Sequence, residues 1–239
     1  GFCMVPDKQP RLRTVDKTQP LYKPNHFPKP FAYALGRELI YLLATRGQNV
    51  RLEGNDWEEI FARCIGAQWR PSNIGLDDIV CQGMAWGAKT VKNRNPFTAR
   101  TVRLISGRNS TIYSFGDSDI THQTPKTLGN KILSIWNSRV SEVRKKFKVL
   151  RTVVLLKADD LTEVSVFEAD TVLYPAENFN WQWNDNDNLE GLSKETNKHV
   201  FTWQPHGSQF TIIETVPDDR LKLRIRKPPT LNQTQVLDA

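Results

Sequence analysis

Asp78 and Lys89 are the residues of this chain whose types and spacing could support catalysis. They fall in the segment 73–95, whose two short apolar runs are interrupted at Gln82-Gly83, a pattern that predicts a β-hairpin. A hairpin with Asp78 on its first strand and Lys89 on its second brings both side chains to one end of a sheet. There a carboxylate can hold Mg²⁺, which lowers the pKa of a bound water, and an ammonium can neutralise charge developing on a phosphate. The alternative is a surface salt bridge, which contributes little.

The residues around this pair resemble the PD-(D/E)xK nuclease family, whose pattern is a helix glutamate, an aspartate, and a second acid two places before a lysine. Asp78 is similar to the first acid, with Asp77 as a neighbouring candidate, and Lys89 is similar to the lysine. Glu58, on a predicted helix, is similar to the glutamate that often supports the metal site. The resemblance covers residues 55–92. It implies Asp78, Glu58 and Asp77 as metal ligands, and Asp78, Lys89 and Glu58 as catalytic residues.

The same resemblance implies a restriction-endonuclease-like fold and a Mg²⁺-dependent endonuclease that cuts double-stranded DNA at specific sites. If both strands of a symmetric site are cut, a homodimer is expected, because a two-fold protein matches a two-fold site. Two alternatives stay open. One is a protein that binds DNA on the same scaffold without cutting it, and the other is an RNA-binding or RNA-processing protein.

The chain departs from the family pattern at Gly87, where the second acid should stand. Three explanations are open. A backbone carbonyl near Ala88, waters and the DNA phosphate could complete the shell around Mg²⁺. Glu58 or Asp77 could take over the role of the missing carboxylate. The third explanation is a weakened or inactive site, and it favours the non-cutting alternative.

Residues suited to nucleic-acid contacts lie in three places. The segment Ser-Gly-Arg-Asn-Ser at 106–110 follows a predicted strand, and Arg and Asn side chains suit the edges of guanine and adenine. The predicted hairpin tip at 203–209 has the same character, and basic residues after Lys89 suit phosphate contacts. An ordinary polar turn and a solvated hairpin tip are the alternatives. The predicted DNA contacts are Lys92, Arg94, Arg103, Ser106, Arg108, Asn109, Ser110, Trp203, Gln204, His206 and Gln209.

The composition agrees with a nucleic-acid partner. The net charge of +7 over 239 residues favours a polyanion without determining the fold. The odd count of three cysteines without CxxC spacing argues against a disulfide framework and favours a reducing cytoplasm. No apolar run approaches the roughly 20 residues of a membrane span, so no membrane partner is expected.

The elements that position these residues are expected to form one mixed α/β domain, with a central sheet flanked by helices. The nearly all-apolar middle of 149–158 predicts a central strand covered on both faces. The polar stretch 178–197 is expected to be a loop, whose Trp181 and Trp183 either stack on bases or anchor it to the core. The predicted helices are 31–43, 55–64 and 130–147; the other predicted strands are 101–107, 163–174, 199–204, 209–216 and 221–226.

The two ends of the chain are expected to lie outside this domain. Residues 1–30 contain six prolines and predict an extended arm laid against the body or a partner. The predicted domain covers 31–227, and residues 228–239 form a loose polar tail.

Overall fold

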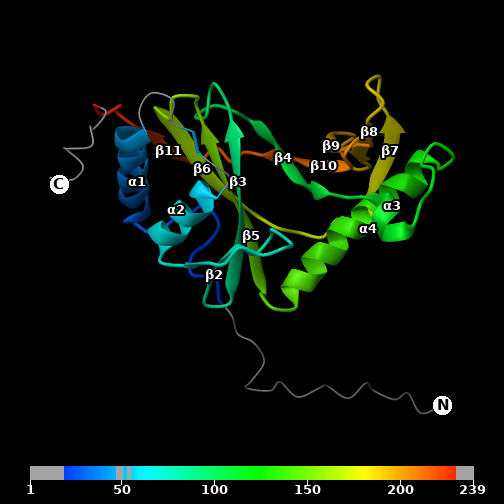
Figure 1. The fold of residues 1–239 in the computed structure, drawn as a ribbon, viewed down its shortest axis with the longest axis horizontal. Helices are drawn as coiled ribbons and strands as arrows, with labels where there is room; N and C mark the ends of the chain where they lie inside the picture. Colours follow the sequence, from blue (N-terminus) through cyan, green and yellow to red (C-terminus); the bar gives the residue numbers. More distant parts are fainter. Residues whose placement is uncertain (1–18, 47–50, 53–54, 230–239) are drawn as a thin grey trace, which may run out of the picture.

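A computed structural model describes residues 19–46, 51–52 and 55–229 and shows a mixed α/β protein built around two β-sheets (Figure 1). The first sheet carries two helices, and the longest helix lies beside the second sheet. None of the helices in the described ranges is both long and apolar enough to span a membrane. The helices are α1 (Phe31–Arg46), α2 (Asp56–Ile65), α3 (Thr111–Phe115), α4 (Pro125–Arg144) and the 3₁₀ turn η1 (Ala176–Asn178).

The first sheet has the strand order β1-β2-β3-β5-β6-β11. β3 runs parallel to β5, and the other neighbouring strands are antiparallel. β5 lies between β3 and β6 and is buried on both faces, which confirms the predicted central strand. The strands are β1 (Gln68–Trp69), β2 (Ile79–Cys81), β3 (Met84–Lys92), β5 (Val149–Lys157), β6 (Glu163–Asp170) and β11 (Leu221–Arg224).

The predicted β-hairpin is present as β2 and β3. Its turn is Gln82-Gly83, where both residues have positive φ, 47° and 80°. Glycine adopts this conformation without steric cost, which is why the break between the two apolar runs marks a tight turn. Helix α2 ends at Ile65, one residue beyond the predicted end, and Gly66 caps it with φ 70° and its backbone N–H bonded to helix carbonyls.

The second sheet is antiparallel throughout, in the order β4-β10-β9-β8-β7. The prediction of a single central sheet was therefore incomplete, and the loop predicted at 178–197 is wrong, because β7 and β8 form a hairpin there. Asn184 explains the error: its side chain accepts bonds from the N–H groups of Asn186 and Asn188, so the polar run is the hairpin turn. The strands are β4 (Thr101–Arg108), β7 (Phe179–Trp183), β8 (Leu189–Ser193), β9 (His199–Gln204) and β10 (Gln209–Thr215).

β6 ends at Asp170, four residues earlier than predicted, because the chain then turns to helix α4. Trp136 Nε1 donates to Val172 O at 3.0 Å. Asn137 forms two 2.8 Å bonds with the backbone of Tyr174, one to its carbonyl and one from its N–H. Helix α4 thus satisfies backbone groups that a strand partner would otherwise take.

The described part of the predicted arm, residues 19–30, lies against the first sheet. The Glu168 carboxylate of β6 accepts 2.8 Å bonds from Tyr22 Oη and Trp86 Nε1, and a third bond from Asn25 N. The Asn25 side chain donates to the Glu168 carbonyl and accepts from the Glu168 N–H. Arg151 pairs with Glu168 at 3.5 Å and donates to Tyr22 O at 2.7 Å. These buried polar groups fix the segment to the sheet. Residues 1–18 and 230–239 of the predicted arm and tail are outside the described residues.

Candidate active site

β3 has a strand on each side only over its first three residues. β2 pairs with Met84, Ala85 and Trp86, whereas β5 continues beside β3 as far as Lys92. From Gly87 onward, no strand of the described chain pairs with the β2 side of β3. An open groove of about 480 Å³ lies at this part of β3. Its lining comes from α2 (Trp57, Glu58), β3 (Ala88, Lys89, Thr90, Val91, Lys92) and β4 (Arg103, Leu104, Ile105).

The structure brings Glu58, Asp78 and Lys89 together at this place. Asp78 is buried and immediately precedes β2, and Ser72 N donates to its Oδ1 at 2.8 Å. Glu58 is half-buried in the first turn of α2 and accepts a 2.9 Å bond from Trp69 Nε1. Lys89 reaches the same place from the middle of β3, so three separate elements supply the three side chains.

The electrostatics show how closely these groups interact. Burial raises the pKa of Glu58, the bond from Trp69 and the charge of Lys89 lower it, and Asp78 raises it through its charge and a hydrogen bond between the two carboxyls. Burial lowers the pKa of Lys89; Asp78 and Glu58 raise it, and the charge of Arg139 lowers it again. The two carboxyls and the lysine therefore act on one another, and Arg139 adds its charge at Lys89.

Glu58 and Asp78 form a donor set that fits Mg²⁺. This ion is usually bound through one or two carboxylates and keeps waters or phosphate oxygens as its other ligands. The two carboxyls interact electrostatically, so a cation placed between them would be attracted by both. Within the described ranges no group of three or more Asp, Glu, His or Cys side chains gathers to hold a metal. Asp77, the third predicted ligand, instead accepts a 2.5 Å bond from Ser72 Oγ.

Gly87 lies against the loop that precedes β2. A Cβ atom on residue 87 would stand 3.2 Å from Gly75 O and 3.3 Å from Leu76 Cα, tighter than ordinary van der Waals contact. The backbone of this loop occupies the space beside the position where the family pattern has its second acid. A side chain at residue 87 therefore requires the loop to move by a few tenths of an ångström.

Lys89 also lines a more enclosed cavity of about 80 Å³ between the two sheets. Glu214 of β10 faces this cavity; burial raises the pKa of its carboxyl, which accepts a 3.4 Å bond from Tyr174 Oη. Arg139 of α4 lines the cavity as well. Other lining residues are Gly87, Ser106, Gly107, Trp136, Thr152 and Asp170. The cavity thus connects the candidate catalytic lysine to the predicted DNA-contacting segment on β4.

The two segments predicted to contact bases lie side by side. Asn109 N donates to Ser208 O at 2.8 Å, and Arg108 Nε donates to Gly207 O at 3.1 Å. Arg108, Gln204 and His206 are exposed there, and Gln209 is half-buried. Segments about a hundred residues apart in the chain thus form one polar surface at the end of the second sheet.

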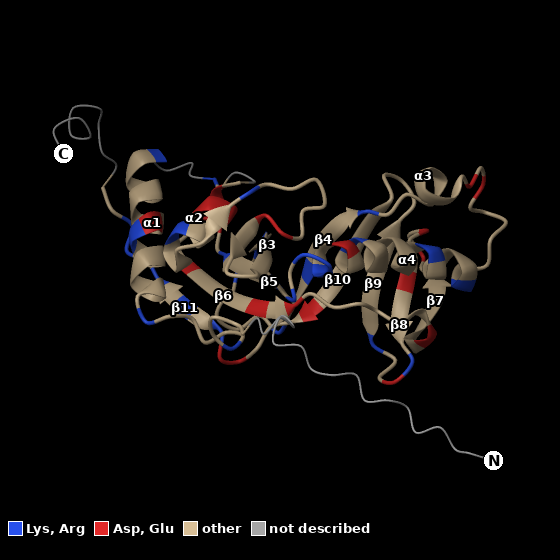
Figure 2. Cartoon of the chain, turned by 90° about the horizontal axis from the view of Figure 1, so that it is seen from below, with Lys and Arg blue, Asp and Glu red and all other residues tan. Residues whose placement is uncertain are grey.

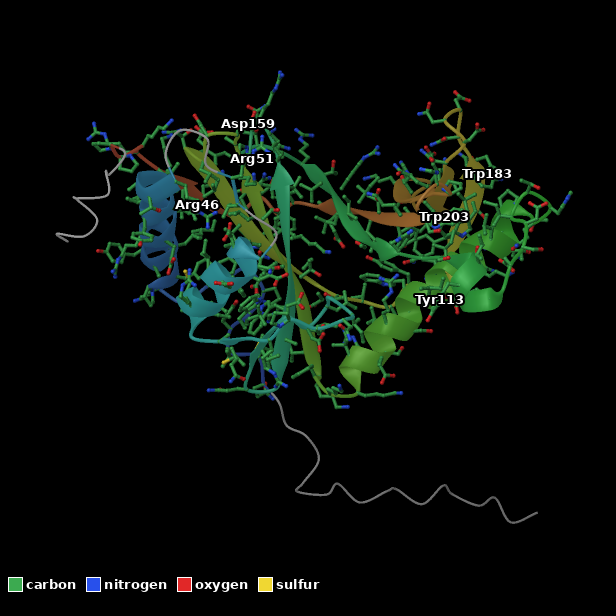
Figure 3. All side chains as sticks on the ribbon, in the orientation of Figure 1. Arg46, Arg51, Tyr113, Asp159, Trp183 and Trp203 are labelled. Atoms are coloured by element: carbon green, nitrogen blue, oxygen red, sulfur yellow. The ribbon has the colours of Figure 1, made fainter. Side chains whose placement is uncertain are left out.

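Asn109 and Trp203 face inward, and the prediction that their side chains contact DNA is wrong. Asn109 is fully buried; its Nδ2 donates to Ile132 O at 3.0 Å, and its Oδ1 accepts from Arg139. Trp203 is 1% exposed, lies within the second sheet (Figure 3), and donates to Asn109 O at 3.1 Å. Both side chains hold the segment in place, which leaves them unavailable to bases.

Ser106 and Ser110 also make bonds within the protein. Ser106 is buried, and its Oγ donates to Leu104 O at 3.0 Å. Ser110 caps helix α3 by accepting a 3.2 Å bond from Tyr113 N. The Ser106 side chain is therefore not available to DNA, and this predicted contact is wrong. The predicted DNA contact of Ser110 stays a prediction.

The predicted phosphate contacts lie on the surface. Arg94 and Arg103 are exposed, and Lys92 forms an exposed 3.0 Å ion pair with Asp159 beyond the end of β3 (Figure 3). Lys92 and Arg103 line the groove that also contains Glu58 and Lys89. Figure 2 shows basic residues gathered around β4 and β10, between the two ends of the molecule. Their positive charge lies beside the acid pair.

Sequence reasoning missed Arg139, which lies within the predicted helix 130–147 and was not named as a site residue. The buried stripe of this helix contains Trp136 and Val140, and Arg139 lies between them in sequence. A basic residue beside a buried stripe, three residues after a core tryptophan, is the signal that could have identified it.

Comparisons with known proteins identify no relative of this chain. No protein-family model matches it, and neither does a curated protein or a solved structure. The chemistry of the chain is therefore inferred from the placement of Glu58, Asp78 and Lys89.

Proposed function

We propose that this protein is a Mg²⁺-dependent endonuclease that cuts double-stranded DNA at specific sites, on a restriction-endonuclease-like scaffold. One observation carries the proposal: Glu58 of a helix and Lys89 of a strand line an open groove, and the buried Asp78, from the loop before β2, interacts with both. The mixed sheet with helices α1 and α2 on it supports the scaffold. These three residues also match the order of the PD-(D/E)xK pattern.

Each side chain has a distinct role in the proposed reaction. Glu58 and Asp78 would hold Mg²⁺, which when bound lowers the pKa of a water and polarises a phosphate oxygen. Lys89 stabilises the charge that develops on the phosphate, and its half-buried position strengthens that interaction. Ser72 N and Trp69 Nε1 orient the two carboxyls through the bonds described above.

The surface around the site supports a duplex as the substrate. Lys92 and Arg103 would contact phosphates next to the acid pair. Arg108, Gln204 and His206 are exposed hydrogen-bonding side chains at one end of the second sheet, as base readout requires. Cutting both strands of a symmetric site would take two copies of the chain, so we propose a homodimer as the working form.

The test is cleavage of plasmid DNA with and without Mg²⁺. The parent should nick or linearise the plasmid only with the ion, and Asp78→Ala and Lys89→Ala should each lower the rate on the order of 10³-fold. Both variants should still bind DNA in a gel-shift assay. Glu59→Ala is the matched control, since Glu59 is a neighbouring acid whose ion pair with Arg63 lies at the surface. A variant at residue 78 or 89 that cuts as fast as the parent would show that the site is elsewhere.

Gly87 favours a second candidate, a DNA-binding protein that does not cut. The loop at Gly75 and Leu76 crowds the position of a second acid on β3, and among the described residues no group of three or more acids, histidines or cysteines gathers to hold a metal. DNA binding without nicking at any concentration of Mg²⁺ or Mn²⁺ would support this candidate. The same experiment should include competition between DNA and RNA duplexes for binding at fixed salt. Tighter binding of RNA would contradict both the endonuclease and the non-cutting DNA-binding protein.

A further inference from the structure

Arg139 is a half-buried arginine whose hydrogen bonds all go to one short segment. Its Nη1 donates to Ser106 O at 2.9 Å, and its Nη2 donates to Asn109 Oδ1 and, at 3.5 Å, to Arg108 O. All three acceptors are uncharged oxygens, and burial lowers the pKa of Arg139. The hydrogen bonds of the guanidinium therefore hold residues 106–109 against helix α4.

The segment held by Arg139 is tied to three other elements through Asn109. Its Nδ2 donates to Ile132 O of α4, its N–H donates to Ser208 O of the β9–β10 tip, and its carbonyl accepts from Trp203 Nε1. Segment, hairpin tip and helix are thus one bonded unit. The exposed Arg108 lies on this unit and donates to Gly207 O.

Arg139 and Lys89 line the same cavity, together with Ser106 and Gly107. The two positive charges therefore face one enclosed space of about 80 Å³. A displacement of residues 106–109 that carries the guanidinium along changes the electrostatic environment of the lysine.

Gly107 lets the guanidinium approach the backbone. Its φ is +106°, a conformation that other residues rarely adopt, and a Cβ atom there would stand 2.3 Å from Arg139 Nη1. Gly116 has a similar requirement for positive φ, +67°, but open space around its Cα. Backbone strain and contact with Arg139 can therefore be separated experimentally.

We infer that Arg139 is a positioning residue that couples the nucleic-acid contact of Arg108, held on segment 106–109, to Lys89. The role of Lys89 in this coupling rests on the proposed function. When Arg108 engages DNA, the bonds from Arg139 transmit the position of the segment to the lysine. Arg139 itself touches no substrate in this arrangement. Its effect is exerted through the placement of Arg108 and the charge next to Lys89.

A double-mutant cycle tests the coupling. Arg108→Ala should lower cleavage about tenfold in the parent but less than about twofold when Arg139→Gln is present, because the link is already broken. Arg139→Lys should restore part of the coupling. Arg144→Gln is the matched control, since Arg144 on the same helix donates to Thr171 O at 2.6 Å. If Arg108→Ala lowers cleavage by the same factor in the parent and in the Arg139 variants, the inference is overturned.

DNA affinity is a readout that does not depend on cutting. Arg139→Gln should weaken the effect of Arg108→Ala on DNA affinity, and Arg144→Gln should leave that effect unchanged. Gly107→Ala should weaken it as well, whereas Gly116→Ala should not. Equal behaviour of the two arginine variants, or of the two glycine variants, contradicts the coupling even if the parent cuts DNA. A parent that binds but never cuts contradicts the proposed function alone.

Discussion

The carboxyl groups of Glu58 and Asp78 interact electrostatically, although one lies on helix α2 and the other precedes strand β2. Burial and the interaction with Asp78 both favour the protonated form of Glu58 and raise its pKa. A divalent cation stabilises the alternative state, in which both are ionised. Their proximity therefore destabilises the metal-free protein and prepares it for a metal.

The first prediction is that Glu58→Gln stabilises the metal-free protein at neutral pH. Because burial and Asp78 raise the pKa of folded Glu58, the unfolded chain loses its proton first as pH rises. The contribution of Glu58 to stability is full below the ordinary glutamate pKa and is lost as pH rises through the folded pKa. We expect the glutamine variant to escape this loss and to gain about 0.5–1 kcal/mol at pH 7.

Urea unfolding between pH 4 and 8 without Mg²⁺ measures this effect. Glu59→Gln is the control, because Glu59 is the neighbouring helix acid and forms a surface ion pair with Arg63. Mg²⁺ should stabilise the parent more than the Glu58 variant. Identical pH dependence in parent and Glu58→Gln would contradict the electrostatic description of the pair.

The second prediction concerns the position of the missing acid. Gly87→Asp should lower stability by about 1–3 kcal/mol without increasing cleavage, because its Cβ would press on Gly75 and Leu76. Gly87→Ala introduces the same Cβ without a charge and should lose a similar amount. Urea unfolding and plasmid cleavage measure the two properties. A stable aspartate variant that cuts faster than the parent would mean that the loop gives way readily.

Local patterns in the sequence predicted the elements whose signals are local. The turn at Gln82-Gly83, the end of α2 at Gly66 and the central strand β5 each follow from a few neighbouring residues. The β7–β8 hairpin could not be predicted in this way. Its support comes from distant contacts, since Trp181 packs against Phe201 of β9 and against helix α4.

The same distinction applies to the candidate site. Glu58, Asp78 and Lys89 were identifiable because their order along the chain carries the pattern. The burial of Asn109 was not, because its partners come from α4 and from the β9–β10 tip. Arg139 was missed for the same reason: its role depends on how α4 packs on β4, which periodicity does not reveal.

The third prediction separates exposed from buried residues in the DNA-contacting segment. Arg108→Ala should weaken DNA binding by about 1–3 kcal/mol and leave stability within about 0.5 kcal/mol of the parent, because Arg108 is exposed. Asn109→Ala should instead lower stability by about 1–3 kcal/mol, since it leaves buried groups of Arg139 and Ile132 without a partner. Fluorescence anisotropy and urea unfolding measure the two effects. Equal loss of stability in both variants would contradict the assignment.

The fourth prediction concerns the buried pair of Arg151 and Glu168, whose side chains are 1% and 0% exposed. Arg151→Met should cost about 3–5 kcal/mol at neutral pH, because it leaves a buried carboxylate without its cation. Burial raises the pKa of Glu168 and Arg151 lowers it, so the variant should raise it further. Its deficit in stability should therefore shrink as pH falls and Glu168 takes up a proton.

The control for this pair is Arg224→Met, because the 3.4 Å ion pair of Arg224 with Glu163 lies at the surface. Arg224→Met should lower the free energy of unfolding by less than about 1 kcal/mol at any pH. Urea unfolding at pH 5 and pH 7 measures all three proteins. A deficit of Arg151→Met that is the same at both pH values would show that lost packing, rather than the unpaired carboxylate, is the cause.

The fifth prediction tests how helix α4 holds the second sheet. Trp181 of β7 lies across Gly129, where a Cβ atom would stand 2.2 Å from the indole ring. Gly129→Ala should therefore lower stability by about 1–3 kcal/mol despite the better helix propensity of alanine. Gly36→Ala is the matched control, since Gly36 lies inside α1 with nothing within 4 Å of its Cβ position, and it should gain about 0.5–1 kcal/mol. If Gly129→Ala is instead stabilising in urea unfolding, Trp181 is free to move and does not anchor the β7–β8 hairpin to the helix.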